Sequence, residues 1–300
     1  MSRYRSILLG GLFVFLFGFG CSDQSATANI EPPPMAPPSN DGSAIDDVQL
    51  DAELATEVKK DVPYVPTPQP VVDRMLEMAD LSGDELLYDL GSGDGRIVIT
   101  AAEKYGNRGV GIDIDPERIR EANENARRAG VTDKVKFIEA DLFETDLRPV
   151  GALTLYLLSS VNLKLRPKIL DELQPGTRVV SHDFSMGEWE PDEHVSMDRS
   201  EIFLWIVPAK VEGTWSVRPE GGSERSLKID QDFQKFTGES GGVQLTDTRL
   251  RGDEIRFTIP GGSGRGAAQR YEGRVKGDTM QGTVEIDGTG KRPWSARKAS

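Results

Sequence analysis

The chain has 300 residues, and its 36 Lys and Arg against 49 Asp and Glu give a formal net charge of −13 (36 − 49). Hydrophobic residues make up 37% and charged residues 28%, which excludes a fully disordered chain or a membrane protein with many spans. The acidic balance argues against broad nucleic-acid binding, which depends on faces rich in Lys and Arg. The single cysteine, Cys21, excludes internal disulfides and Cys-cluster metal sites, and no metal is expected.

The N-terminal 21 residues predict a targeting signal. Arg3 and Arg5 precede an apolar run at 7–20, which is shorter than the ~20 residues that a membrane span needs. Cys21 follows directly, and the arrangement resembles a bacterial lipoprotein signal, in which that cysteine is lipidated and becomes the new N-terminus. We therefore expect an exported protein held to the membrane on the periplasmic side. A short uncleaved inner-membrane anchor with a cytoplasmic body is the alternative.

Residues 22–61 predict a disordered tether. Five prolines lie at 32–38, and the stretch 41–61 is acidic with few large apolar residues. Such a segment cannot bury enough apolar surface to fold.

From 62 to 211 the chain alternates between strands and helices. Strands are predicted at 86–90, 110–113, 135–140, 152–158 and 179–184, and helices at 97–105, 116–129 and 163–173. A late apolar run at 202–207 is expected to pair antiparallel at the edge. Helices interleaved with buried strands predict an α/β fold, a Rossmann-like doubly wound sheet covered on both faces.

After residue 210 the pattern changes to that of an all-β domain at 212–300. The stretch from 211 onward holds 16 of the 32 glycines, and alternating runs lie at 226–230, 254–258 and 282–286. The pairs Gly252-Asp253 and Gly277-Asp278 fall where hairpin turns are expected. These features predict an antiparallel meander of about seven or eight strands that could close as a small barrel.

A glycine-rich loop follows the first predicted strand. It carries Gly91, Gly93 and Gly95, with Asp89 before them and Asp94 among them. Glycines let the backbone turn tightly and approach a ligand, but the spacing differs from the G-x-G-x-x-G dinucleotide fingerprint. Carboxylates disfavour a pyrophosphate and suit the ammonium of a zwitterionic ligand. The loop therefore favours S-adenosylmethionine over NAD, and a purely structural turn is the alternative.

Acidic residues also end the second and third strands. Asp113 lies where a carboxylate accepts both ribose hydroxyls. Asp115 competes for that role, but as the residue before Pro116 it is better explained as a helix N-cap. Asp141 could accept from an adenine amino group and the Leu142 amide could meet a ring nitrogen, while a loop cap is the alternative for Asp141. Ligands of open α/β sheets bind at the carboxyl ends of strands.

With these motifs, residues 62–211 resemble the class I, seven-β-strand S-adenosylmethionine-dependent methyltransferases. The resemblance implies a strand order 3-2-1-4-5-7-6 and a cofactor lying across the first two strands. It places the family's glycine motif on 89–95, its ribose acid on Asp113 and its adenine acid on Asp141.

Three segments, at 64–68, 155–158 and 176–181, are similar to a narrower branch of that family. The branch includes the mitochondrial lysine methyltransferases of the ATP synthase c subunit and the adenine nucleotide carrier. The resemblance implies N-methylation of a protein lysine, hence a protein partner. The alternative is an exported binding module, in which the β domain binds a partner or ligand and the Rossmann-like half is vestigial.

Methylation of lysine requires a neutral amine, which demands desolvation or a nearby base. Candidates at the mouth are Tyr64, Tyr156 and His182. Tyr64 is the weak catalytic candidate, since Pro63 and Pro66 hold it in a rigid segment. Tyr156 is expected in the core, and His182 is expected to hydrogen-bond a loop. The segment after the fourth strand lacks an Asn-Pro-Pro-Tyr motif and no basic aromatic stripe occurs, so nucleic acid is not expected as the substrate.

Overall fold

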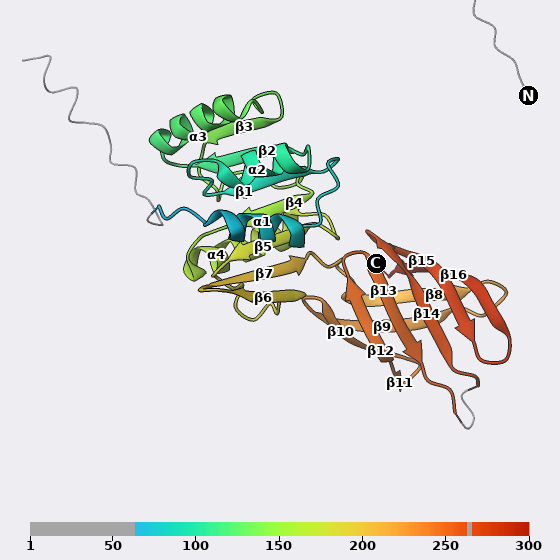
Figure 1. The fold of residues 1–300 in the computed structure, drawn as a ribbon. Helices are drawn as coiled ribbons and strands as arrows, with labels where there is room; N and C mark the ends of the chain where they lie inside the picture. The colour runs from blue at the N-terminus through green and yellow to red at the C-terminus, as the bar shows by residue number, and fades with distance from the viewer. Residues whose placement is uncertain (1–63, 263–265, 300) are drawn as a thin grey trace, which may run out of the picture. The chain divides into compact units, whose positions relative to one another are not determined.

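The computed structural model describes residues 64–262 and 266–299, so the predicted signal, the tether and Cys21 lie outside the described residues. The described chain contains two β-sheets, one of seven strands and one of nine (Figure 1). None of the helices in the described part is both long enough and apolar enough to cross a membrane.

The first sheet has the strand order β3-β2-β1-β4-β5-β7-β6, which confirms the predicted order. Strands β1 to β5 are parallel, and β7 pairs antiparallel with β5 and with β6. The strands are β1 (Leu86–Leu90), β2 (Arg108–Asp113), β3 (Val135–Glu139), β4 (Ala152–Leu155), β5 (Arg178–His182), β6 (Glu193–Met197) and β7 (Ser200–Ile206). The sequence did not predict β6, because this edge strand buries none of its side chains fully and so lacks an apolar pattern.

Four helices accompany this sheet: α1 (Gln69–Met78), α2 (Arg96–Lys104), α3 (Pro116–Ala129) and α4 (Ser159–Glu172). The predicted bounds of α3 are confirmed. Asp115 is its N-cap, with a side chain that accepts from Glu117 N, and Gly130 ends the helix at φ +72°. Helix α4 begins four residues earlier than predicted, because β4 ends at Leu155 rather than at 158.

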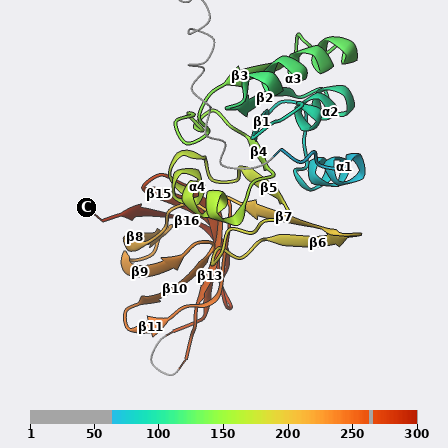
Figure 2. The same ribbon diagram turned by 90° about the vertical axis from the view of Figure 1, so that its left-hand side faces the viewer.

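Side chains that alternate along the strands pack into two separate core layers, one on each face of the sheet. Leu153 and Val179 pack in a cluster with α4, whereas Ala152 and Val180 pack in a cluster with α1 and α2. Successive strand residues point to opposite faces, so α4 covers one face and α1 and α2 cover the other (Figure 2). The predicted doubly wound architecture is confirmed.

The second sheet is antiparallel, with the order β11-β10-β9-β8-β16-β15-β14-β13-β12. Its nine strands exceed the predicted seven or eight, and one of them has only two residues. They are β8 (Gly213–Pro219), β9 (Arg225–Asp232), β10 (Lys235–Ser240), β11 (Val243–Gln244), β12 (Thr246–Arg251), β13 (Glu254–Ile259), β14 (Gln269–Lys276), β15 (Thr279–Ile286) and β16 (Gly290–Lys298).

This meander curls into a nearly closed barrel. The last strand of the meander, β16, pairs with the first, β8. At the remaining gap, Leu245 N, directly before β12, donates to Gly238 O of β10 at 2.8 Å. The interior is filled by large rings, including Trp215, Phe257 and Trp294. Both predicted Gly-Asp turns join adjacent strands, β12 to β13 and β14 to β15.

Candidate functional site

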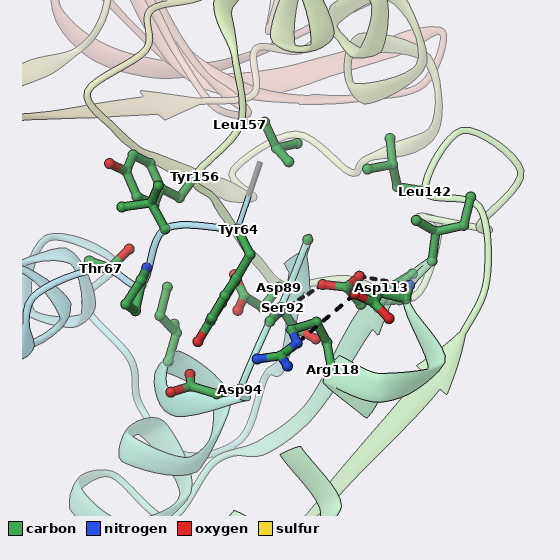
Figure 3. A pocket seen from close by; sticks show the side chains of 18 of the residues that line it. Tyr64, Thr67, Asp89, Ser92, Asp94, Asp113, Arg118, Leu142, Tyr156 and Leu157 are labelled. Carbon is green, nitrogen blue, oxygen red and sulfur yellow. Dashed lines mark hydrogen bonds and ion pairs between the residues drawn. The ribbon is translucent and has the colours of Figure 1, made fainter. Parts of the chain in front are cut away.

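A pocket of about 220 Å³ opens at the carboxyl ends of β1 to β4. Six of the seven predicted cofactor-binding residues line it: Asp89, Gly91, Gly93, Asp113, Asp141 and Leu142. Figure 3 shows Tyr156 and Thr67 on one side of the pocket, Asp113 and Leu142 on the other, and Tyr64 and Asp89 between them. The parallel strands bring these residues together, because their carboxyl ends share one edge of the sheet.

The glycine loop after β1 allows close approach to the pocket. Gly91 has φ +77° and Gly93 φ +51°, conformations that side-chain-bearing residues rarely adopt. A Cβ on Gly91 would lie 2.8 Å from Leu157 Cδ2, and one on Gly93 would lie 2.4 Å from Tyr64 Cε2. Both positions therefore require glycine for backbone conformation and for space.

Gly95, the seventh predicted residue, is not among the residues lining the pocket. It is the residue before α2, at φ +79°, and a Cβ there would lie 2.5 Å from Phe137 Cζ and 3.0 Å from Ala122 Cβ. Its glycine serves the packing of α2 and α3 on β3.

Asp113 is held at the end of β2 by two backbone amides. Its Oδ2 accepts from Gly93 N at 2.8 Å, and its Oδ1 accepts from Asp115 N at 3.0 Å. Each carboxylate oxygen has a second acceptor direction, so the group can still receive ribose hydroxyls. Asp115 also lines the pocket, and its Oδ1 accepts from Glu117 N at 3.0 Å as the predicted helix cap.

Asp89 is the most deeply buried acid of the pocket, with 2% of its surface exposed. Its Oδ1 accepts from Thr154 Oγ1 at 2.7 Å. The pKa of Asp89 is raised to about 7, chiefly by burial and also by the charges of Asp113 and Asp94, while the Thr154 hydrogen bond lowers it. A ligand ammonium beside it would favour the ionised form.

Asp141 and Leu142 follow β3 on the far side of the pocket. Asp141 Oδ1 accepts from Phe143 N at 2.8 Å, which is the loop-capping contact considered for it. The residue nevertheless lines the pocket, and Leu142 beside it is half-buried. The capping contact is compatible with contact to a ligand base, because a carboxylate accepts several hydrogen bonds.

The aromatic candidates have different environments. The Tyr64 ring lies against Gly93 and under Arg118, whose Cζ is 4.7 Å from the ring centroid. Burial, and then the charge of Asp94, raise the pKa of Tyr64, so its hydroxyl stays protonated at neutral pH. The prediction that Tyr156 is a core residue was wrong: it is half-buried and lines the pocket.

His182 makes the hydrogen bonds expected of a structural histidine. It is 1% exposed, with Nδ1 3.2 Å from Thr67 Oγ1 and Nε2 3.0 Å from Ser200 Oγ. Burial lowers the pKa of His182, against the opposing charge of Asp183. The imidazole is therefore neutral at physiological pH and has a hydroxyl at each nitrogen.

Sequence reasoning missed Ser92, Thr67 and Phe184, which also line the pocket. Ser92 is 5% exposed, and its Oγ has no hydrogen-bond partner among the described residues. A buried hydroxyl without a partner costs stability unless a ligand satisfies it. Its position between two motif glycines was the available signal.

The pocket fits S-adenosylmethionine in its shape and its polar groups. The glycines leave space beside the backbone for a ligand. Asp113 can accept hydrogen bonds from the ribose hydroxyls, and Asp89 can pair with the ammonium. The Ser92 hydroxyl, which has no partner among the described residues, can hydrogen-bond a ligand. Within residues 64–262 and 266–299, no group of three or more His, Cys, Asp or Glu is placed to hold a metal ion.

Comparison with known proteins agrees with this geometry. Residues 89–193 match the family model described as the ANTKMT methyltransferase domain. A protein-lysine N-methyltransferase of Saccharolobus islandicus is 45% identical over 151 residues, which are 49% of this chain and 94% of that protein. The Mus musculus lysine N-methyltransferase of the ATP synthase c subunit is 28% identical over 190 residues, covering 63% of this chain and 72% of that protein.

Among solved structures, an RNA methyltransferase from Salinibacter ruber in complex with S-adenosyl-L-homocysteine is 56% identical. The match covers 49% of this chain and 96% of that chain, with a TM-score of 0.48. The identity and coverage of the archaeal relative decide the assignment. The chain belongs to the protein-lysine N-methyltransferase family of S-adenosylmethionine-dependent enzymes.

Proposed function

We propose that the chain transfers a methyl group from S-adenosylmethionine to the side-chain amine of a lysine in a protein. The observation that carries the proposal is the set of three acids, Asp89, Asp113 and Asp141, lining one pocket beside the glycine loop. Relatives named as lysine methyltransferases, one of them 45% identical, support the choice of acceptor.

The acids divide the binding of the cofactor between them. Asp113 accepts from the ribose, Asp89 pairs with the ammonium, and Asp141 with Leu142 meets the adenine. When bound, S-adenosylmethionine would supply an activated methyl group to the lysine amine, with the thioether sulfur as leaving group. The work of the protein is positioning and exclusion of water.

No side chain of the pocket is assigned as a general base. The Tyr64 hydroxyl, the weak candidate from the sequence, has a raised pKa and belongs to the pocket wall. His182 is buried and has a hydroxyl at each ring nitrogen. The acceptor amine therefore arrives at a partly desolvated site, where burial favours its neutral form.

The test is transfer of label from methyl-tritiated S-adenosylmethionine to proteins of a cell extract, followed by amino-acid analysis of the hydrolysate. The wild type should yield radioactive methyl-lysine, and Asp113→Ala should yield much less. The extract is also split into protein and RNA, so that the class of acceptor is measured directly. Label found only in RNA would show that the acceptor is RNA rather than protein lysine. If calorimetry detects no binding of S-adenosylmethionine, the alternative of an exported binding module with a vestigial Rossmann-like half is favoured.

We also propose that the chain is an exported lipoprotein, in which residues 22–61 tether residues 62–211, the methyltransferase domain, and 212–300, the β domain. The support is the position of Cys21 directly after the apolar run. Several acyl chains at ~0.8 kcal/mol per buried CH₂ give stable anchoring. Mass spectrometry of the wild type should find cleavage before Cys21, and Cys21→Ser should leave an unlipidated precursor. An intact wild-type N-terminus would instead support the uncleaved anchor.

A further inference from the structure

The tips of β4 and β5 carry an aromatic group that the cofactor assignment leaves unused. The Tyr156 ring centroid lies 3.9 Å from the ring of His182 and 6.1 Å from that of Phe184, with interplanar angles of 32° and 27°. Since β4 and β5 pair in parallel, with Leu155 opposite Ser181, the residues following them lie side by side. Tyr156 and Phe184 both line the pocket.

These rings stand at the methionine end of the proposed cofactor site. Strand β4 also pairs with β1, and Thr154 of β4 donates to Asp89, the proposed partner of the ligand ammonium. Asp113 and Leu142 lie on the opposite side of the pocket, where the ribose and adenine are assigned (Figure 3). The ring of Tyr156 therefore faces the region in which the methyl group and its acceptor meet.

Neither ring has a cation of the protein over it in the described part of the chain. Among the described residues, Arg or Lys groups lie over Tyr64, Phe143, Phe233 and Trp215, and none lies over Tyr156 or Phe184. Aromatic faces attract ammonium groups, more strongly where water is excluded. One side of the Tyr156 ring packs against His182 and Phe184, so the parts of the two rings that line the pocket are the ones available to an entering amine.

Asp183 sets the position of this wall. It has φ +62°, which is costly for a residue with a side chain. Two hydrogen bonds to one residue hold it: Asp183 N donates to Glu201 O at 2.6 Å, and Glu201 N donates to Asp183 Oδ1 at 2.8 Å. Asp183 Oδ2 lies 3.4 Å from Nε2 of His182, the ring against which Tyr156 packs. Asp183 thereby acts on Tyr156 through His182, and it directly precedes Phe184 in the chain.

We propose that Tyr156 and Phe184 form an amine-binding wall for the acceptor side chain, which enters as an ammonium ion and loses its proton to solvent before methyl transfer, and that Asp183 is the positioning residue of that wall. The inference rests on the proposed function and adds the residues that recognise the acceptor. It assigns to this end of the pocket an alkylammonium ligand, such as the end of a lysine side chain.

The test uses two cofactor analogues and needs no identified acceptor. Sinefungin carries an amine where S-adenosylmethionine carries the transferable methyl group, and S-adenosylhomocysteine carries nothing there. Calorimetry on the full chain should show that the wild type binds sinefungin about tenfold more tightly, the size expected for an ammonium on a desolvated aromatic face. Tyr156→Leu and Phe184→Leu should each reduce this preference, measured as the ratio of the sinefungin affinity to the S-adenosylhomocysteine affinity of the same variant.

Conservative variants separate the wall from its positioning residue. Tyr156→Phe keeps the ring and should keep most of the preference, whereas Asp183→Asn should weaken it. Tyr105→Leu, at a tyrosine outside the pocket lining, should leave the preference at the wild-type value. If Tyr156→Leu does not fold, the sinefungin preference of the wild type and its loss in Phe184→Leu still test the amine-binding wall.

The failures of the two proposals are distinguishable. Absence of S-adenosylhomocysteine binding to the wild type would overturn the proposed function. Binding of S-adenosylhomocysteine without a preference for sinefungin, or a preference that survives both leucine variants, would overturn the amine-binding wall and leave the methyltransferase intact.

Discussion

Protonation of Asp89 should couple cofactor affinity to pH. The carboxyl group is 2% exposed and its pKa is raised to about 7 by burial. A ligand ammonium binds well only to the ionised form, so affinity should follow the ionised fraction and rise with pH. An exposed aspartate would already be ionised throughout this range and would give no such pH dependence.

The magnitude follows from the pKa. With a pKa of about 7, the ionised fraction of Asp89 grows from ~0.03 at about pH 5.5 to ~0.76 at about pH 7.5. Affinity for S-adenosylhomocysteine should therefore rise about 25-fold, or ~1.9 kcal/mol, over these two pH units.

The assay is calorimetry at a series of pH values on the wild type and on Asp89→Asn. Asparagine keeps an oxygen that can accept from Thr154 and has no charge to lose, so its affinity should be lower and flat. The ratio of the two affinities cancels the titration of the ligand itself. A wild-type affinity that is constant between pH 5.5 and 7.5, or an asparagine variant with the same slope, would refute the coupling.

The raised pKa of Asp89 also predicts how the stability of the unliganded protein depends on pH. Because the folded-state pKa of Asp89 lies above the unfolded value of 3.8, the folded chain keeps a proton that the unfolded chain loses. The free energy of unfolding should therefore fall as the pH rises from about 4 to about 7, and less so in Asp89→Asn. Urea denaturation at several pH values measures the difference.

Three further predictions follow from the site and the fold. Asp113→Ala should cost about 1.5–3 kcal/mol of cofactor binding by calorimetry, whereas Asp115→Ala should cost ~1 kcal/mol of stability with affinity little changed; reversed effects would contradict the division of roles. Gly95→Ala, which meets an aromatic ring, should lose about 1–3 kcal/mol more in denaturation than Gly130→Ala, where nothing lies within 4 Å, and equal losses would contradict the packing role. Residues 210–300 should fold alone with a β-type circular dichroism spectrum, and a helix-dominated spectrum would disprove this.

Much of the first sheet could be predicted from the sequence, because its signals are local. The helix after Asp115 begins with a cap and Pro116 and ends at Gly130 within fifteen residues, so no distant part of the chain is needed to define it. The same holds for the left-handed glycines at 91 and 93, which the backbone of a tight turn requires. Strand β6 left no such signal, because an edge strand without a buried face has no apolar alternation.

The environment of the acceptor side was decided by tertiary structure. Thr67 and His182 are 115 residues apart in the chain and within hydrogen-bonding distance of each other, and no periodicity links them. The apolar neighbours of Tyr156 predict a core residue. In the structure β4 ends at Leu155, and Tyr156 follows it and lines the pocket. Ser92 became informative only when its hydroxyl proved to be buried without a partner in the described structure.

The sequence by itself therefore determined the strand and helix pattern, the glycine turn and the acids that end the strands, since each depends on residues close together in the chain. Tertiary structure decided which of these acids is buried enough to change its pKa, which aromatic rings face the pocket, and how the last strand meets β8 to complete the barrel. Those properties depend on what other segments of the chain bring alongside a residue, because burial and contact arise between segments that sequence spacing does not relate.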